Sequence, residues 1–271
     1  MSLEINFLEA CDCHVHIYDG IQALAPTATF TPPFAPVENY QKVQSELGIS
    51  RVVVIQPTGY GFDNTCTLEA ISKLGDGARG VAVIKPDISD AELFSLHVAG
   101  VRGVRFMMLP GGLLPWDVLT LVASKIAQLG WNINLQLDGC EIHHHEHLLR
   151  DLPCKLVIDH IGKFLTPIQI NDASFISLCR LLDSGNCWIK LSAPYESSRS
   201  GFPDYADLRD RTQYLASNYS NRVLWASNWP HPNVKPEPSN VDMLNWTMQF
   251  FTNFLTQKYL LIDNPAEVYG F

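Results

Sequence analysis

Two histidines, His14 and His16, stand two positions apart at the end of a β-rich run near the start of the chain. Successive side chains of a strand point to opposite faces, so these two imidazoles share one face. A single histidine is most often a core residue satisfied by hydrogen bonds. Two imidazoles on one face are costly to desolvate unless they bind a metal, a substrate or polar partners. The pair therefore predicts a functional site.

Other polar side chains fall at or just beyond the ends of later β-rich runs, and they belong to His160, His231, Arg105, Asn134, Gln136, Asp138, Lys190 and Ser192. The two-residue period places Asn134, Gln136 and Asp138 on one face, and Lys190 with Ser192 on another. Arg105 and Arg102 point in opposite directions, and we assign Arg105 to the site because a guanidinium at a strand end can form a forked contact with a substrate carboxylate or carbonyl.

Eight β-rich runs alternate with eight amphipathic segments, which is the pattern of parallel βαβ units. The expected strands are 9–18, 51–57, 79–85, 103–108, 132–138, 155–161, 187–192 and 222–228, and the expected helices are 37–47, 64–74, 90–99, 116–129, 141–151, 168–183, 205–218 and 241–256. This order predicts an α/β fold, a single-domain (β/α)₈ TIM barrel over residues 1–271. In such a barrel, catalytic groups project from the C-terminal strand ends.

Composition narrows the function classes. The 271 residues are 46% hydrophobic and 17% charged, and the formal charge is -9 with no basic run, which argues against a nucleic-acid partner. No apolar stretch reaches the length of a membrane span, residues 1–10 lack the pattern of an export signal, and the seven scattered cysteines favour reduced thiols. We expect a cytoplasmic enzyme that acts on a small molecule; its oligomeric state stays open.

Four ordered motifs resemble the amidohydrolase-2 branch of the amidohydrolase superfamily, and within it the 2-pyrone-4,6-dicarboxylate lactonase family. They are His14-Val15-His16, Gly103-Val104-Arg105-Phe106, Ile158-Asp159-His160-Ile161-Gly162 and Asn228-Trp229-Pro230-His231-Pro232. The similarity extends from about Cys11 to Asp263-Asn264-Pro265. The resemblance implies opening of a lactone ring by water, with His14, His16 and His160 polarising the carbonyl.

The resemblance fails at one position, because the family's catalytic aspartate before Trp-Pro-His is Asn228 here. A neutral amide cannot take a proton from water at ordinary pH. Three interpretations stay open: an engineered substitution, a different base such as Asp138 or His231, or a protein that binds without turnover. Ala226-Ser227, where the family usually has Gly-Thr, favours natural divergence.

Substrate contacts also differ from those of the dicarboxylate lactonases. Gln136 stands at the family's strand-five tyrosine, Tyr195 lies in a segment where the family has an arginine, and the basic group after the strand-six histidine is Lys163. We assign Arg105, Gln136, Lys163, Tyr195 and His231 to substrate binding. Fewer cationic contacts predict a less anionic, more hydroxylated lactone, such as one derived from a sugar acid.

The same histidines could also bind a metal ion. His14, His16 and His160 could hold a weak mononuclear Zn²⁺ site, but Asn228 supplies no anionic ligand and the resembled lactonases need no metal, so we expect no required cofactor. The alternative functions are a metal-dependent decarboxylase or hydratase of the same branch, and a catalytically impaired protein that binds a carboxylated ligand.

Overall fold

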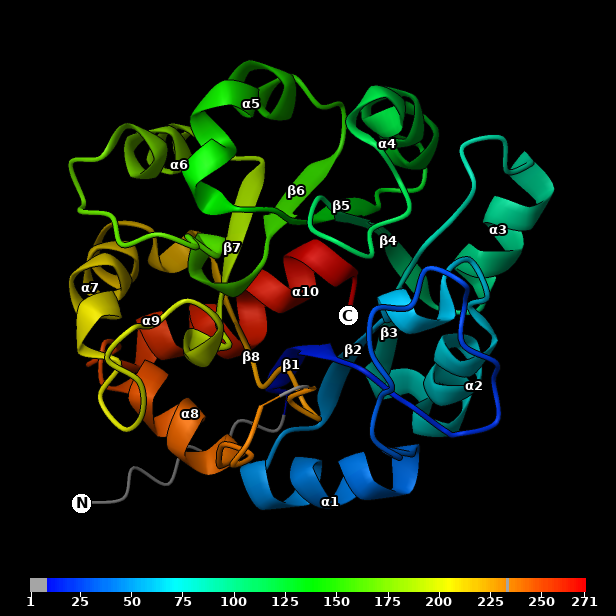
Figure 1. Cartoon of the computed structure of the whole chain (residues 1–271), viewed down its shortest axis with the longest axis horizontal. Helices are drawn as coiled ribbons and strands as arrows, with labels where there is room; N and C mark the ends of the chain where they lie inside the picture. Colours follow the sequence, from blue (N-terminus) through cyan, green and yellow to red (C-terminus); the bar gives the residue numbers. More distant parts are fainter. Residues whose placement is uncertain (1–8, 233) are drawn as a thin grey trace.

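Eight parallel strands form one sheet in the computed structural model, which describes residues 9–232 and 234–271. The strands pair in chain order as β1 (Cys11–Val15), β2 (Arg51–Ile55), β3 (Ala78–Ala82), β4 (Val101–Met107), β5 (Asn132–Gln136), β6 (Lys155–Ile158), β7 (Cys187–Ser192) and β8 (Val223–Ala226). Figure 1 shows them as a ring with helices outside. The predicted α/β barrel class is confirmed, and the strands are shorter than expected at several ends.

The ring closes between β8 and β1 through backbone hydrogen bonds beyond the regular ladders. Asn228 N donates to His14 O at 3.0 Å, and His16 N donates to Trp229 O at 2.8 Å. A buried carboxylate reinforces this seam, because Asp12 accepts hydrogen bonds from Ser227 N at 2.9 Å and from Ser227 Oγ at 2.5 Å. The closure therefore fixes His14, His16 and Asn228 side by side.

The helices are α1 (Val37–Leu47), α2 (Thr65–Leu74), α3 (Asp90–Val98), α4 (Leu119–Ala127), α5 (Ile142–Arg150), α6 (Ala173–Asp183), α7 (Arg209–Asn218), α8 (Asn240–Met248), α9 (Phe254–Lys258) and α10 (Asn264–Tyr269). Helices α1 to α8 surround the strands in Figure 1, whereas α10 lies across the ring. The single helix expected over 241–256 was wrong: the chain breaks after α8, and the Asn253 side chain caps α9 by accepting from Thr256 N.

Apolar side chains fill the N-terminal half of the barrel. Cys11, Cys13, Val53, Trp188 and Leu224 are buried together there. The unpredicted helix α10 contributes Val268 and Tyr269 to the same cluster and crosses the middle of the ring in Figure 1. Water is thereby excluded from this end, and polar side chains meet only nearer the C-terminal strand ends.

A register shift in β1 explains how one strand serves both halves of the interior. The pairing of β1 with β2 is irregular between Asp12 and Val15. Such a bulge inserts one residue and reverses the facing of the side chains that follow. As a result Cys11 and Cys13 pack in the apolar half, while His14 also faces inward.

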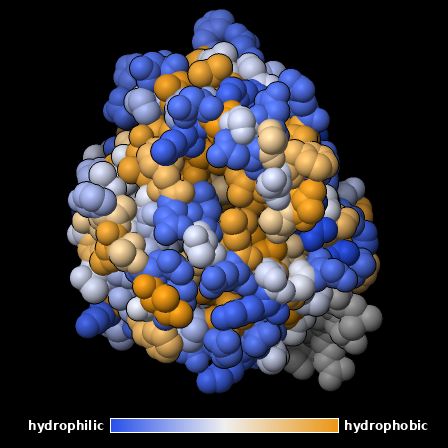
Figure 2. Space-filling view, turned by 90° about the vertical axis from the view of Figure 1, so that its right-hand side faces the viewer, coloured by the Kyte–Doolittle hydropathy of each residue, from blue (hydrophilic) through white to orange (hydrophobic). Residues whose placement is uncertain are grey.

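The outer surface mixes hydrophilic and hydrophobic residues. On the face shown in Figure 2, hydrophobic residues gather along the middle between hydrophilic ones. Phe94 and Val98 of α3 are among the exposed apolar side chains. In the described part of the chain, every helix is too short or too polar to cross a lipid bilayer. Most of the N-terminal stretch expected to lack an export signal lies outside the described residues.

Candidate active site

The three histidines predicted to act together meet at the C-terminal side of the barrel interior. Nε2 of His14 lies 3.2 Å from Nε2 of His16, and the ring centroids of His14 and His160 are 4.8 Å apart. All three side chains are buried. His160 follows β6 directly and has a positive φ of 53°, a backbone conformation that costs a non-glycine residue about 1 to 3 kcal/mol. Such strain is typical of positions held for function.

Beneath the imidazoles lies a buried ion pair that the sequence did not predict as a unit. Nζ of Lys190 lies 3.1 Å from Oδ1 of Asp159, 3.1 Å from Nδ1 of His14 and 2.5 Å from Oδ1 of Asn134. The hydrogen bonds of Lys190 go to His14 and Asn134, and its contact with Asp159 is an ion pair. Asn134 Nδ2 also donates to Asp159 Oδ2 at 2.8 Å. The pair is thus compensated in charge, while Oδ1 of Asp159 has no hydrogen-bond partner among the described residues.

Nδ1 of His14 lies 3.1 Å from the ammonium of Lys190 and 3.4 Å from Oδ1 of Asp159. When Lys190 donates to it, this nitrogen accepts and Nε2 carries the hydrogen. Nε2 of His14 then donates to Nε2 of His16, and Nδ1 of His16 donates to the carbonyl oxygen of Ile55 at 2.8 Å. One set of neutral tautomers therefore satisfies both rings.

Electrostatics agree with neutral imidazoles. Burial lowers the pKa of His14 well below its ordinary value, with Lys190 acting in the same direction. Burial together with Arg105 lowers the pKa of His16 to about 3. Burial also lowers the pKa of His160. At neutral pH these rings act by hydrogen bonding and not as cations.

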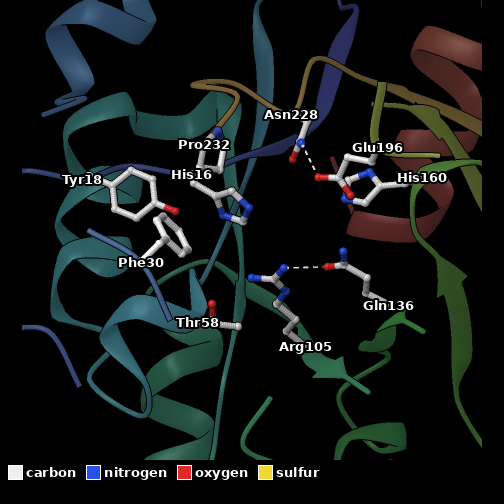
Figure 3. A pocket seen from close by; sticks show the side chains of 10 residues that line it. All are labelled: His16, Tyr18, Phe30, Thr58, Arg105, Gln136, His160, Glu196, Asn228 and Pro232. Atoms are coloured by element: carbon white, nitrogen blue, oxygen red, sulfur yellow. Dashed lines mark hydrogen bonds between the residues drawn. The ribbon is translucent and has the colours of Figure 1, made fainter. Parts of the chain in front are cut away.

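A pocket opens above the histidines, and Figure 3 shows the residues around it. Its lining consists of His16, Tyr18, Phe30, Thr58, Arg105, Gln136, His160, Glu196, Asn228 and Pro232. In this view Arg105 and Gln136 lie below the cavity, and Asn228, Glu196 and His160 lie above it. The residues come from the ends of several strands and from the loop after β1, as expected for a barrel enzyme.

Arg105 supplies a cation that forms no ion pair with a carboxylate of residues 9–232 or 234–271. Its Nη1 donates to Gln56 O at 2.8 Å and its Nη2 donates to Gln136 Oε1 at 2.9 Å, whereas its buried Nε has no hydrogen-bond partner among the described residues. Arg102 points outward and donates to the carbonyl oxygen of His97. The choice of Arg105 over Arg102 therefore matches the geometry.

A second network runs from Asn228 away from the pocket. Asn228 Nδ2 donates to the Tyr195 hydroxyl at 2.8 Å, this oxygen lies 3.0 Å from Nδ1 of His231, and Nε2 of His231 lies 2.9 Å from Oδ1 of Asn240. The amide oxygen of Asn240 only accepts, so His231 donates to it and accepts from Tyr195. Tyr195 and His231 thus lie behind the lining and orient Asn228.

Glu196 is a pocket residue that sequence reasoning missed. It ends a short 3₁₀ turn, Pro194–Glu196, just after β7, and its carboxylate contacts Nζ of Lys163 through Oε2. Its Oε1 accepts from Asn228 Nδ2 at 3.4 Å. An acidic residue four positions after a strand end was the available signal. Lys163 lies outside the lining, and its charge is directed at Glu196.

Asp138 lies away from the pocket lining, which corrects the expectation that it shares the inward face with Gln136. β5 ends at Gln136, so the alternation of the strand does not extend to residue 138. Oδ1 of Asp138 accepts from the backbone N–H groups of Cys140 at 3.0 Å and Leu165 at 3.1 Å. It ties two loops together and is not placed to reach a substrate.

Three residues could together coordinate a metal ion, because ligand atoms of His14, Asp159 and His160 all lie within 4.8 Å of one another. The fit is poor. Lys190 lies 3.1 Å from both Nδ1 of His14 and Oδ1 of Asp159, and a cation there repels a second one. Nε2 of His16 also lies 3.2 Å from Nε2 of His14 and is engaged by it. A metal ion bound by these residues would have to displace the ammonium of Lys190.

Comparison with known proteins agrees with this geometry. The family model described as "Amidohydrolase" matches residues 11–271. A Comamonas testosteroni protein named 2-pyrone-4,6-dicarboxylate hydrolase is 32% identical, over 96% of this chain and 90% of its own length. A protein from Agrobacterium fabrum named D-galactarolactone isomerase is 30% identical, with the same coverage. An Agrobacterium tumefaciens crystal structure is 29% identical and superposes with a TM-score of 0.92, covering 97% of this chain and 96% of that one. The chain is therefore a member of the amidohydrolase family.

Proposed function

We propose that this protein opens the ring of a carboxylated lactone with water. The observation that supports this most is a single pocket that combines Arg105, His160 and Glu196 with the neutral amides of Gln136 and Asn228. A cation, an imidazole and a carboxylate in one cavity are what acyl transfer needs for binding, polarisation and proton transfer. Relatives at about 30% identity are named as lactone hydrolases and as a lactone isomerase.

The reaction adds water to the ester carbon and breaks the ring C–O bond. Arg105 holds the free carboxylate through the guanidinium N–H groups that Gln56 and Gln136 do not use. Nδ1 of His160 lies 2.9 Å from the Ser192 hydroxyl, and when this hydroxyl donates, Nε2 of His160 carries a proton toward the lactone carbonyl. The developing oxyanion is stabilised by this donor. The leaving alkoxide takes a proton, and the product is a hydroxy acid.

The charge of the pocket favours one carboxylate on the substrate. Arg105 is uncompensated by acidic partners, whereas the charge of Lys163 is neutralised by Glu196. Gln136, Thr58 and Tyr18 add neutral polar groups to the lining. Hydroxyl groups suit such partners better than a second carboxylate does. A lactone of a sugar diacid, with one acid in the ring ester and one free, fits this pattern.

A panel of lactones tests the function. The wild-type protein is incubated with sugar-diacid lactones, aldonolactones and 2-pyrone-4,6-dicarboxylate, and ring opening is followed by acid release and by NMR. Hydrolysis of a hydroxylated monocarboxylate, lost in His160→Gln and retained in the α5 surface variant His147→Gln, is the expected outcome. If no lactone is consumed faster than in buffer, the proposal fails.

Isomerisation is the second candidate. Hydrolysis would use a base at position 228 to take a proton from water, but this residue is the amide Asn228. One relative is named D-galactarolactone isomerase. In that reaction a hydroxyl of the substrate replaces water as the attacking group, and a second lactone forms. Reaction in H₂¹⁸O separates the two outcomes, because hydrolysis places ¹⁸O in the product carboxylate and direct isomerisation leaves the lactone unlabelled.

We also propose that turnover needs no resident metal, since the ammonium of Lys190 lies 3.1 Å from both Nδ1 of His14 and Oδ1 of Asp159 and repels a second cation there. Protein dialysed against a chelator is expected to keep its activity within about twofold of the untreated protein, a margin well under 1 kcal/mol. Stoichiometric zinc that leaves together with the activity would contradict this assignment and would support the metal-dependent decarboxylase or hydratase alternative.

A further inference from the structure

The attacking oxygen must lose a proton, and few groups in the pocket can accept one. Asn228 is a neutral amide. The ring lone pair of His16 already accepts from His14. His231 uses both ring nitrogens in its bonds to Tyr195 and Asn240 and does not line the pocket. Asp138 and His231, the alternative bases considered from the sequence, both lie outside the pocket lining.

Among the described residues that line the pocket, Glu196 alone carries a carboxylate. Resting on the proposed lactone chemistry, we propose that Glu196 is the general base that takes the proton from the attacking oxygen. The O–H bond of water breaks, its oxygen bonds to the ester carbon, and Glu196 becomes a carboxylic acid. When the ring C–O bond breaks, the acid returns this proton to the leaving alkoxide, so Glu196 ends each turnover ionised.

Two neighbours orient the carboxylate for this role. Lys163 contacts Oε2 from outside the lining, and Asn228 Nδ2 approaches Oε1 at 3.4 Å. This second contact is long, so Oε1 keeps the capacity to accept a hydrogen bond from water. In Figure 3, Glu196 and Asn228 point toward one another at the same edge of the cavity, with His160 beside them.

The surrounding groups keep Glu196 ionised. Burial raises its pKa and Asp159 acts in the same direction, but protonated His160 and Lys163 outweigh them, so that the pKa lies below the ordinary value. At neutral pH, where His160 is uncharged, Lys163 supplies this charge. Arg105 adds another positive group nearby: burial lowers its pKa, and Glu196 is among the groups that oppose this. A base that is already ionised at neutral pH can act across the physiological range.

Asn228 is the residue that this arrangement requires at its position. An amide donates one proton to Tyr195 and one toward Glu196. A carboxylate in its place would face Glu196 with a like charge and disfavour ionisation of both groups. The carboxylate needed by the reaction is thus supplied by the turn after β7, and the residue after β8 orients it.

The test uses a lactone that the wild-type protein consumes, with kcat and KM measured across pH. Glu196→Gln is expected to lower kcat by about 10²- to 10⁴-fold with little change in KM, and Glu196→Asp to retain part of the rate. Lys163→Met removes a counter-charge, so the acid limb of kcat/KM should move to higher pH. Glu146→Gln, which breaks the surface ion pair with Arg180, is the matched control and should match wild type.

The outcomes separate the two proposals. Folding of each variant is checked by near-UV circular dichroism, and the isosteric Glu196→Gln and the conservative Glu196→Asp guard against loss of fold. A wild-type rate in Glu196→Gln, or an acid limb unmoved by Lys163→Met, overturns the role of Glu196 and leaves lactone turnover standing. If the wild-type protein consumes no lactone at all, the proposed function falls and the role of Glu196 falls with it.

Discussion

Nζ of Lys190 lies 3.1 Å from Nδ1 of His14, although the two residues are 176 positions apart and come from β7 and β1. This contact joins the ion pair of Lys190 and Asp159 to the imidazoles that face the pocket. As a donor, Lys190 favours the tautomer of His14 that is protonated on Nε2, and this nitrogen lies 3.2 Å from Nε2 of His16. The fully buried cation therefore acts on the site without touching the cavity.

Replacing this cation should destabilise the fold strongly. Lys190→Met leaves the carboxylate of Asp159 buried without its counter-ion, and breaking a buried pair in this way costs about 3 to 5 kcal/mol. Urea unfolding measures the loss. Lys258→Met, which breaks a half-exposed pair with Asp263, is the control and should cost no more than about 1 kcal/mol. Equal losses of unfolding free energy in the two variants would show that the buried pair stabilises the fold no more than the half-exposed pair does.

Arg105→Met should weaken binding of a carboxylated lactone selectively. A hydrogen bond to a charged group contributes about 1.5 to 3 kcal/mol, which corresponds to a rise in KM of about 10- to 150-fold. The methyl ester of the same lactone should be affected much less, because it has no charge to lose. Arg102→Met lies on the same strand but points outward, and it should leave both KM values unchanged. A uniform loss with acid and ester would place Arg105 outside carboxylate recognition.

Asp12 should make the stability of the barrel depend on pH. Burial raises the pKa of its carboxyl to about 6, although hydrogen bonds from Ser227, His14 and Tyr40 oppose this. The folded state therefore holds this proton more tightly than the unfolded state, and the stabilising contribution, present below about pH 4, is lost as the pH rises through about 6. The difference in unfolding free energy between wild type and Asp12→Asn should fall by on the order of 3 kcal/mol from pH 4 to pH 7.

The control for Asp12 has the opposite sign. Hydrogen bonds from Thr65 lower the pKa of the exposed carboxyl of Asp63, so its contribution is lost as the pH falls. The difference between wild type and Asp63→Asn should therefore rise with pH. A pH-independent gap for Asp12→Asn would mean that this carboxyl does not retain its proton in the folded barrel.

Asn228→Asp should couple to Glu196. It places a second carboxylate where the amide now lies 3.4 Å from Oε1 of Glu196, so the variant should be less stable at neutral pH than at acidic pH. Glu196→Gln in the same chain should relieve the repulsion. Within one network such coupling amounts to about 0.5 to 3 kcal/mol, which a double-mutant cycle measured by urea unfolding resolves. Additive effects of the two substitutions would mean that the side chains do not interact.

The sequence determined the barrel and much of its rim. Buried parallel strands such as Val52-Val53-Val54-Ile55 carry apolar side chains on both faces, and this local pattern indicates strands covered by helices. The two-residue alternation also placed His14 with His16, and Asn134 with Gln136, on inward faces. The same alternation gave the wrong facing for Asp138, because β5 ends at Gln136. No local signal in the sequence marked Gln136 as the last residue of the strand.

Only the tertiary structure decided which groups act on one another. Lys190, Asp159 and His14 come from three strands, and their distances depend on closure of the ring and on the register shift in β1. The pairing of Glu196 with Lys163 and Asn228 likewise joins the loops after three strands. Local sequence patterns determine each strand and helix. Contacts between strand ends depend on how the whole barrel closes, so local patterns do not predict them.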